Sequence, residues 1–400
     1  NDHSTISGNE AANGGGIYNG DYSTVNLNDH STISGNEAAK GGGIYNKHFN
    51  TVSLSDRSSI RDNTAREYGG GICNSYNIFS SNTTVNLNDH STISGNEAAN
   101  GGGIYNRYYD TVSLNDHSSI SGNTAKDYGG GIYNRYYNTV SLNDNSSVSG
   151  NEAANGGGIY NRYYSTVSLN DNSSISGNIA KDYGGGIFNG DYGAVSLLGQ
   201  SNIAHNIADF GGGIYNCGKS LNLFDNGHIY NNTASMGGGI YNNYNSIVNL
   251  NDHSTISGNE AASGGGIYNN YNSIVNLNDH STISGNGAAN GGGIYNTGLF
   301  STVSLNDHST ISGNEAANGG GIYLEKGQVN LFDNGHINTN IASMGGGIYN
   351  RRDSIVNLVS GSIEHNIATS PSPSGGGIYN RGILWGNLDI VRNNRPDQIA

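Results

Sequence analysis

Several residue types are scarce in this chain of 400 residues, and each scarcity excludes a class of protein. Cys73 and Cys217 are the only cysteines, so no disulfide framework holds the fold together. Positive charge is also scarce, because 17 basic residues are dispersed along a chain of net charge −14. This dispersal excludes a nucleic-acid binder, which needs concentrated positive charge to neutralise phosphates. No run of about 18 apolar residues occurs, so we expect no membrane span in this segment.

Glycine, by contrast, is abundant, and its clusters mark a repeat. The 64 glycines have no collagen period and gather in the tetrapeptide GGGI. A fixed period of 26 to 32 residues separates the copies, which indicates a solenoid or a propeller rather than a globular domain. The isoleucines of the fourteen copies are at positions 17, 44, 72, 104, 132, 159, 187, 214, 240, 267, 294, 322, 348 and 378.

Each period contains three short runs with the alternating pattern of half-buried strands. In residues 28–54 these runs are STIS around Ile33, GIYN from Ile44, and TVSL with Val52. A propeller blade needs four strands in about 40–45 residues, so three strands in about 27 residues favour one coil of a parallel β-helix. The sequence therefore predicts an all-β, right-handed parallel β-helix of about 14 coils with almost no helix, its handedness following from the rule for parallel crossovers.

Two domains are expected. Residues 1–382 carry the repeats, and residues 383–400 form a divergent segment that we expect to cap the end, with Trp385 covering it. The chain begins inside a repeat, so we expect its N-terminus and any targeting segment to lie upstream. Two irregular stretches, at 75–82 and 369–374, are expected to be loops of no function, although function remains an alternative.

Stacked coils should place every residue on its own copy. Three aliphatic ladders are therefore expected inside the helix, and the glycine triplet should make a corner with positive φ. Buried asparagines should bond amide to amide along the stack. The expected ladders are Ile6, Ile33, Ile93, Ile120, Val148 and Ile175; Ile17, Ile44 and Ile72; Val52 and Leu54; Asn9, Asn36, Asn63 and Asn96; and Asn19, Asn46, Asn74 and Asn106.

The pairing of SGN with GGGIYN resembles the repeat of chlamydial polymorphic outer membrane proteins and of related secreted adhesin-like proteins. The resemblance covers essentially the whole chain. It implies a right-handed parallel β-helix on the cell surface, often as a passenger or a stalk.

Three consecutive coils carry the tripeptide RYY, the most distinctive basic and aromatic feature on this acidic chain. Aromatic faces and guanidinium groups suit sugars or anionic polymers, so we take these residues as a candidate glycan-binding patch. The alternative is that the tyrosines, including the outward tyrosine of IYN, only pack on each other and shield the corner. The nine candidate residues are Arg107, Tyr108, Tyr109, Arg135, Tyr136, Tyr137, Arg162, Tyr163 and Tyr164.

A second recurring feature is the NDH turn, which stacks aspartate and histidine. Calcium could bridge the stacked carboxylates, and histidine could offset their charge at low pH. We predict no cofactor, since solvated aspartates in Asx turns explain the same row. The residues are Asp2, Asp29, Asp56, Asp89, Asp116, Asp144, Asp171, Asp225, Asp252, Asp279, Asp307 and Asp333, with His3, His30, His90, His117, His253, His280 and His308.

These observations predict a structural or adhesive surface rod, secreted or at the cell surface, without catalysis. A catalytic site needs unique residues, whereas nearly every polar residue here has many copies. The alternatives are a polysaccharide-binding or polysaccharide-cleaving β-helix and, third, an ice-binding surface made of outward Thr/Ser pairs. Expected partners are glycans, other surface proteins, or a second copy joined end to end. The Thr/Ser row includes Thr32, Ser34, Thr92, Ser94, Thr255 and Ser257, with breaks at Asn202, Ala204, His228, Tyr230, His336 and Asn338.

Overall fold

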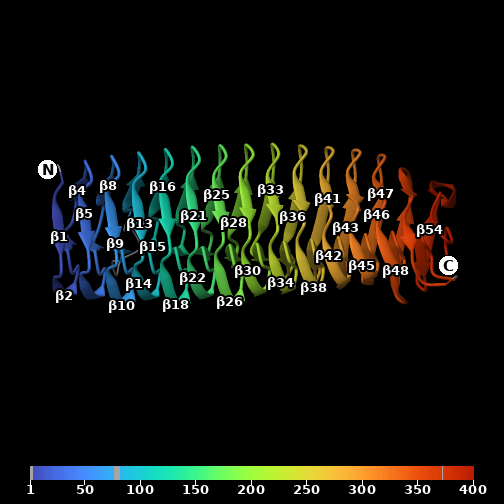
Figure 1. Ribbon diagram of the computed structural model, residues 1–400, viewed down its shortest axis with the longest axis horizontal. Coiled ribbons are helices and arrows are strands. Elements are labelled where there is room, and N and C mark those ends of the chain that lie inside the picture. Colours follow the sequence, from blue (N-terminus) through green and yellow to red (C-terminus); the bar gives the residue numbers. More distant parts are fainter. Residues whose placement is uncertain (1–2, 76–81, 372) are drawn as a thin grey trace. The chain divides into compact units, whose positions relative to one another are not determined.

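The computed structural model describes residues 3–75, 82–371 and 373–400. The chain divides into two compact units, Asn1–Ile207 and Ala208–Ala400. Each unit is a parallel β-solenoid built from short strands (Figure 1), and the repeat gives about 14 turns over the two. The described residues contain one helical segment, the 3₁₀ helix η1, Leu388–Ile390. The prediction of an all-β parallel β-helix with three sheets is confirmed.

One coil shows how the sheets are assigned. Strand β5 (Thr32–Ser34) belongs to the first sheet, here called the Ser/Thr sheet, and β6 (Glu37–Lys40) to the second, the Glu/Ala sheet. Strands β7 (Ile44–Asn46) and β8 (Thr51–Leu54) both lie in the third, here called the long sheet. The predicted number of sheets is therefore correct, but the strand at 37–40 was not expected.

In the first unit, each sheet repeats the same strands coil after coil. The Ser/Thr sheet contains β1 (Thr5–Ser7), β5, β9 (Ser59–Arg61), β13 (Thr92–Ser94), β17 (Ser119–Ser121), β21 (Ser147–Ser149), β25 (Ser174–Ser176) and β29 (Asn202–Ala204). The Glu/Ala sheet contains β2 (Glu10–Asn13), β6, β10 (Thr64–Tyr68), β14 (Glu97–Asn100), β18 (Thr124–Tyr128), β22 (Glu152–Asn155) and β26 (Ile179–Tyr183). The long sheet contains β3 (Ile17–Asn19), β4 (Thr24–Leu27), β7, β8, β11 (Ile72–Asn74), β12 (Thr84–Leu87), β15 (Ile104–Tyr108), β16 (Thr111–Leu114), β19 (Ile132–Tyr136), β20 (Thr139–Leu142), β23 (Ile159–Asn161), β24 (Thr166–Leu169), β27 (Ile187–Gly190) and β28 (Ala194–Leu197).

The second unit follows the same plan, and β30 (Ile207–Phe210) spans the boundary between the units. Its Ser/Thr sheet contains β33 (His228–Tyr230), β37 (Thr255–Ser257), β41 (Thr282–Ser284), β44 (Thr310–Ser312), β47 (His336–Asn338), β51 (Ser362–Glu364) and β55 (Val391–Arg392). Its Glu/Ala sheet contains β34 (Thr233–Met236), β38 (Glu260–Ser263), β42 (Gly287–Asn290), β45 (Glu315–Asn318), β48 (Ile341–Met344) and β52 (Ile367–Ala368). Its long sheet contains β31 (Ile214–Cys217), β32 (Ser220–Leu223), β35 (Ile240–Asn242), β36 (Ile247–Leu250), β39 (Ile267–Asn269), β40 (Ile274–Leu277), β43 (Ile294–Leu305), β46 (Ile322–Leu331), β49 (Ile348–Asn350), β50 (Ser354–Leu358), β53 (Ile378–Asn380) and β54 (Ile383–Gly386).

The interior consists of the expected ladders. Ile33 pairs in register with Ile60 of the next coil, and both side chains are fully buried. The Nδ2 of Asn36 donates to the Oδ1 of Asn63 at 2.9 Å, and Asn46 bonds Asn74 in the same way at 2.8 Å. These buried amides are satisfied by their own copies, and losing such a partner would cost about 1–3 kcal/mol for each unsatisfied group. The prediction of asparagine ladders is confirmed.

Glycine is required in the triplet for two different reasons. Gly41, the first of its triplet, has φ +63°, as expected for a left-handed corner. The second and third glycines do not have positive φ, so the prediction was wrong for them. A Cβ on Gly42 would lie 2.5 Å from the carbonyl oxygen of Thr64 and 2.6 Å from that of Gly70. Glycine is needed there because the next coil approaches too closely for any side chain.

Some Glu/Ala strands of the first unit have one extra residue. Strand β18 pairs with β14 through Ala125 and Ala98, but its register then shifts, so that Tyr128 pairs with Asn100. This β-bulge replaces the EAAN sequence by TAKDY. Strands β10 and β26 carry the corresponding tyrosines, Tyr68 and Tyr183. The bulges therefore add an aromatic ring at the edge of the Glu/Ala sheet, where the EAAN strands have none.

The segment 383–400, predicted as a cap, continues the pairing of the second unit. Strand β54 pairs with β50 in parallel, and β55 pairs with β51. Trp385 lies opposite Asn357 and is 63% exposed. The capping role of this segment stays a prediction.

Candidate functional site

The RYY tripeptides lie at one structural position, the bend between the two strands of the long sheet. This bend, called here the long-sheet bend, comprises residues 107–110, 135–138 and 162–165 in the three coils, and in the first two coils it begins within the last residues of β15 and β19. Tyr109 and Tyr137 have φ values of +56° and +54°, and such left-handed positions are unusual for a bulky residue. Because the backbone adopts a left-handed conformation there, the tripeptide lies on the outside of the coil. The Ile of the preceding strand and the Val of the following strand remain in the core.

Buried polar side chains hold each bend in place. Asp110 is 1% exposed, and its carboxylate accepts hydrogen bonds from the backbone N–H groups of Thr83 and Arg107, both at 3.0 Å. In the next coil, Asn138 takes the equivalent place and accepts from the N–H of Asp110 at 2.8 Å. These bonds satisfy backbone donors that the bend removes from the sheet, so the bend has a fixed shape.

The structure brings all nine predicted residues together as three columns. The inner tyrosines are half-buried and stack at centroid distances of 4.7 Å, and the outer tyrosines stack at 5.1 and 5.2 Å. Each arginine lies over the inner ring of its own coil, at 5.4, 5.1 and 4.4 Å from guanidinium carbon to ring centroid. The inner column is Tyr108, Tyr136 and Tyr163, the outer column is Tyr109, Tyr137 and Tyr164, and the arginine column is Arg107, Arg135 and Arg162.

The arginines are charged and already have partners. Arg135 donates from Nη1 to the hydroxyl of Tyr105 at 3.4 Å, and Arg162 forms an ion pair with Asp191. Partial burial opposes the charge of Arg135, but the hydrogen bond that it donates to Tyr105 and the surrounding phenols outweigh this effect, so the pKa of Arg135 lies above its ordinary value. The guanidinium groups therefore lie over the tyrosine rings and keep only part of their hydrogen-bonding capacity for a ligand.

The outer column is the accessible part of the site. Tyr109, Tyr137 and Tyr164 are 43%, 46% and 51% exposed, and Tyr192, which the RYY motif did not include, extends the stack at 4.9 Å. Tyr22 and Phe49 stack in the same way at 5.1 Å. A sequence signal existed: in the first unit an aromatic residue occurs three positions after the ladder asparagine of IYN, and the search for RYY overlooked it.

The tyrosines of IYN form a packed cluster of their own. They lie on the outer side of the sheet, but Tyr105, Tyr133 and Tyr160 are only 1%, 6% and 4% exposed. They pack with Cys73 under the tyrosines of the bulged strands, such as Tyr128. Burial raises the pKa of Tyr133 to about 12 and also raises the pKa of the Cys73 thiol. These rings therefore form a second apolar cluster outside the solenoid core, and most of them are not available to a ligand.

The NDH turn is a tight reversal with two left-handed residues. Asp29 and His30 have φ values of +46° and +61°, and the N–H of Ser31 donates to the carbonyl of Asn28 at 3.2 Å, which defines a type I′ turn. Figure 1 shows these turns as narrow loops, for example between β4 and β5. The histidines stack along the turn row, with His253 and His280 at 5.2 Å. Asp2 lies outside the described residues.

No metal site is visible in this row or elsewhere in the described ranges. Within residues 3–75, 82–371 and 373–400, no group of three or more His, Cys, Asp or Glu side chains is arranged to hold a metal ion. The expectation that the protein has no cofactor stays a prediction. The predicted loop at 75–82 lies largely outside the described residues, as does position 372 of the loop at 369–374.

The Thr/Ser row is less regular than an ice-binding face requires. Thr32 and Ser59 do approach each other, with their hydroxyl oxygens 3.2 Å apart. The register then places Arg61 beside Ser34, an interruption that sequence reasoning missed. In the second unit, the register places His336 beside Thr310. These breaks interrupt the flat hydroxyl array on which the ice-binding alternative depended.

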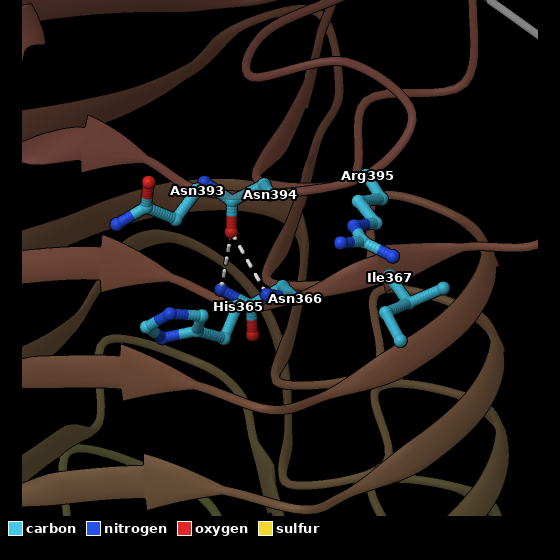
Figure 2. Close-up of a pocket in the computed structure, with 6 residues that line it drawn as sticks. All are labelled: His365, Asn366, Ile367, Asn393, Asn394 and Arg395. Carbon is cyan, nitrogen blue, oxygen red and sulfur yellow. Dashed lines mark hydrogen bonds between the residues drawn. The ribbon is translucent and has the colours of Figure 1, made fainter.

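One hollow lies beside an asparagine ladder in the second unit. It has a volume of about 650 Å³, and its rim includes His365 and Asn393, which replace the positive-φ glycine of SGN. Figure 2 shows these two side chains on one side of the pair Asn366 and Asn394, with Arg395 on the other side. Asn366 donates to the Oδ1 of Asn394 from both N and Nδ2, at 2.9 and 3.0 Å. The hollow is thus an open gap along a structural ladder.

Two segments of the chain, residues 30–47 and 117–135, match the Chlamydia polymorphic membrane protein repeat. No match was found among curated protein sequences or among solved structures. Both segments contain SGN and GGGIYN, so the chain is a β-solenoid repeat protein that resembles chlamydial polymorphic membrane proteins. This repeat and this fold fit an adhesin-like surface protein. In the parts that the structure describes, no helix has the length and apolar character needed to cross a membrane.

Proposed function

We propose that this chain belongs to a secreted or surface-attached adhesin-like protein, and that the long-sheet bends of the first unit bind an acidic glycan. The resemblance to the Chlamydia polymorphic membrane protein repeat supports the surface location. The bends supply the binding chemistry, because they combine aromatic faces with fixed guanidinium groups. The protein would act by holding its partner rather than by transforming it.

The single observation that carries the proposal is the outer tyrosine column. Tyr137 and Tyr164 stack with ring planes only 4° apart, and the exposed edges of the stacked rings form a strip along the bends. Pyranose rings present apolar C–H groups that pack on such aromatic surfaces, and tyrosine hydroxyls offer hydrogen bonds to the sugar. Several weak contacts in a row would add up along a polymer that spans consecutive coils.

The charge distribution favours an acidic polymer over a neutral one. The chain carries a net charge of −14, and the arginine column is a local concentration of positive charge within it. An anionic glycan would be repelled by most of the surface and drawn to this column. Since Arg162 also pairs with Asp191, we expect moderate rather than high affinity for each coil.

No catalysis is part of this proposal. A hydrolase or lyase needs an acid, a base and charge stabilisers that occur once, whereas the bend residues recur in neighbouring coils. Incubation of the protein with pectin or alginate, followed by assays for reducing ends and unsaturated products, should show no turnover. Turnover that disappears when one carboxylate is changed would contradict this expectation.

A glycan array at low and at moderate salt tests the binding. We expect the parent chain to bind acidic glycans, more weakly at the higher salt, and the triple variant Arg135→Ala, Tyr136→Ala, Tyr137→Ala to bind at least tenfold more weakly. A double variant in the NDH turn, Asp116→Ala with His117→Ala, is the matched control and should bind like the parent. Equal binding by the triple variant, or no binding by the parent, would leave the tyrosines as a shield for the bend and refute the proposal.

A further inference from the structure

Along the second unit, the exposed residues of the long-sheet bend change from aromatic and apolar to cationic. The sequence repeat does not reveal this change. One coil places Tyr271 at the bend, and the next places Leu299 and Phe300 there, all strongly exposed. The following coil places Lys326 at the bend, and the one after it Arg352. Aromatic residues and cations are therefore separated into adjacent coils, whereas each of the three RYY coils of the first unit carries both.

Two adjoining hollows lie where the bend residues change from aromatic to cationic. The first has a volume of about 380 Å³ and is lined by Tyr268, Tyr271, Leu299, Phe300 and Lys326, among others. The second, of about 360 Å³, is lined by Glu325, Lys326, Arg351, Arg352, Asp353 and Arg381. Because Lys326 lines both, the two hollows form one continuous surface with an aromatic half and a cationic half.

Strand pairing on both sides of the bend supports the floor of this surface. Strands β43 and β46 pair through Tyr295 and Tyr323 before the bend and through Val303 and Val329 after it, with a shift of register within the bend. Beneath the bend, the tyrosines of IYN stack with nearly parallel planes; Tyr268 and Tyr295, for example, have centroids 4.9 Å apart. A ligand would therefore meet a preformed surface, which reduces the ordering that binding requires.

Glu325 organises the cationic half. Its carboxylate accepts hydrogen bonds from the hydroxyls of Tyr295 at 2.6 Å and Thr297 at 2.9 Å, and it pairs with Nη1 of Arg351 at 3.0 Å. Partial burial would raise the pKa of Glu325, but these donors and the charge of Arg351 outweigh it, so the pKa of Glu325 lies below its ordinary value. Glu325 is thus fully engaged within the protein and does not compete with a ligand for the remaining cations.

The remaining charge is positive. Four cations and two acids line this half, which leaves a net charge of +2 on a chain of net charge −14. Arg381 is held in place by the hydroxyl of Tyr379, to which its Nε and Nη2 donate at 3.1 and 2.8 Å. In the described part of the chain, Arg352 makes no ion pair and is exposed. Its guanidinium is therefore able to take a carboxylate or sulfate in a bidentate manner.

We propose that this surface of the second unit is a separate binding site for an acidic saccharide. A sugar ring would pack on Phe300 and Tyr271, and its carboxylate or sulfate group would pair with Arg352 and Lys326. The ligand class is the one proposed for the first unit, but all the residues are different. The proposal for the second site is therefore independent of the proposal for the first.

The test uses the full chain in a background in which all three arginines of the first-unit site are changed, Arg107→Gln, Arg135→Gln and Arg162→Gln. Binding is measured by calorimetry with three probes: oligogalacturonate for a carboxylate, sulfated dextran for a sulfate, and unmodified dextran as the neutral reference. We expect binding of at least one acidic probe and no binding of unmodified dextran. Whichever acidic probe binds identifies the anionic group.

Two exposed residues are then changed in this background. Arg352→Gln and Phe300→Ser should each weaken binding at least fivefold, and their combination should abolish it. The matched control is Arg57→Gln, which removes an equally exposed arginine from the NDH turn of the first unit and should change the affinity less than twofold. No binding of either acidic probe, equal binding by the Arg352→Gln variant, or an equal loss in the Arg57→Gln control would overturn the proposal.

Discussion

The tyrosines of IYN occur in both units, yet they pack in two different ways. In the first unit, Tyr133 meets Tyr105 and Tyr160 edge to face, at interplanar angles of 86° and 85°. In the second unit, Tyr268 meets Tyr241 and Tyr295 face to face, at 7° and 6°. The motif and its register are the same, so the cause lies outside the motif.

The cause is the neighbouring Glu/Ala strand. In the first unit, the bulged strand β18 places Tyr128 against both Tyr133 and Tyr160, at 5.7 and 4.7 Å. In the second unit, the corresponding positions of β38 and β42 are Ser263 and Asn290, which leave the column undisturbed. One inserted residue in one sheet thus tilts the rings around Tyr133, whereas other pairs of the first unit remain stacked, Tyr18 with Tyr45 at 21° and Tyr160 with Phe188 at 6°.

This difference also separates the two candidate sites. In the first unit, Arg135 donates a hydrogen bond to Tyr105 of the buried cluster, so its guanidinium group is only partly available to a ligand. In the second unit, Tyr295 bonds Glu325 instead, and the arginines of the bend lie beside an open hollow. A basic-aromatic motif within one coil is therefore a weaker indication of a free binding site. Cations and aromatic residues that the register brings together from several coils are a stronger indication.

The largest expected effect comes from removing a ring of the interleaved cluster. Tyr133→Ala empties a closely packed space and should destabilise its region by about 3 kcal/mol. Tyr268→Ala removes a half-buried ring from a parallel stack and should cost about 1–2 kcal/mol. Native-state hydrogen exchange at the amides of β19 and β39 compares the two losses locally, which suits a repeat protein whose coils contact only their neighbours. Equal losses would show that the two packings do not differ in strength.

A smaller effect should follow from removing the bulge itself. Replacement of Thr124–Tyr128 by Glu-Ala-Ala-Asn, the sequence type of β14 and β22, should keep the sheet paired but withdraw the ring of Tyr128. We expect a loss of about 1.5 kcal/mol for this half-buried ring, together with a turn of Tyr133 and Tyr160 toward parallel planes. A crystal structure of the variant shows the ring angles directly.

The reverse exchange is the matched control. Introduction of Thr-Ala-Lys-Asp-Tyr in place of Glu260–Ser263 should bulge β38 and tilt the ring of Tyr268. Rings that remain edge to face in the first variant, or parallel in the second, would contradict the assignment of the cause to the bulged strand.

The sequence could predict the features in which each residue stacks on its own copy in the next coil. The aliphatic and asparagine ladders follow from the register alone, and Ile33 and Asn36 lie where the repeat put them. The strand at 37–40 was missed because its inward residue, Ala38, is small and gives little alternation in hydrophobicity. The RYY columns were found because they repeat, whereas the cationic hollow was missed because it does not. Lys326 and Arg352 are 26 positions apart and resemble random drift until the fold places them together.

The smallest effect concerns Glu325 and its dependence on pH. The pKa of Glu325 in the folded chain is lower than its ordinary value of 4.5, so its ionised form stabilises the fold above that value. This contribution is lost as the pH falls through the lower folded-state pKa. Glu325→Gln keeps the size of the side chain and one acceptor oxygen, so it should cost only about 1 kcal/mol at pH 7. The difference between parent and variant should then shrink toward zero as the solution is acidified below pH 4.5. Urea denaturation at both ends of this range measures it, with the exposed Glu315→Gln as a control that should be neutral throughout. A difference that persists in acid would mean that Glu325 acts through its shape and not through its charge, and the cationic hollow would then lack the organising ion pair described above.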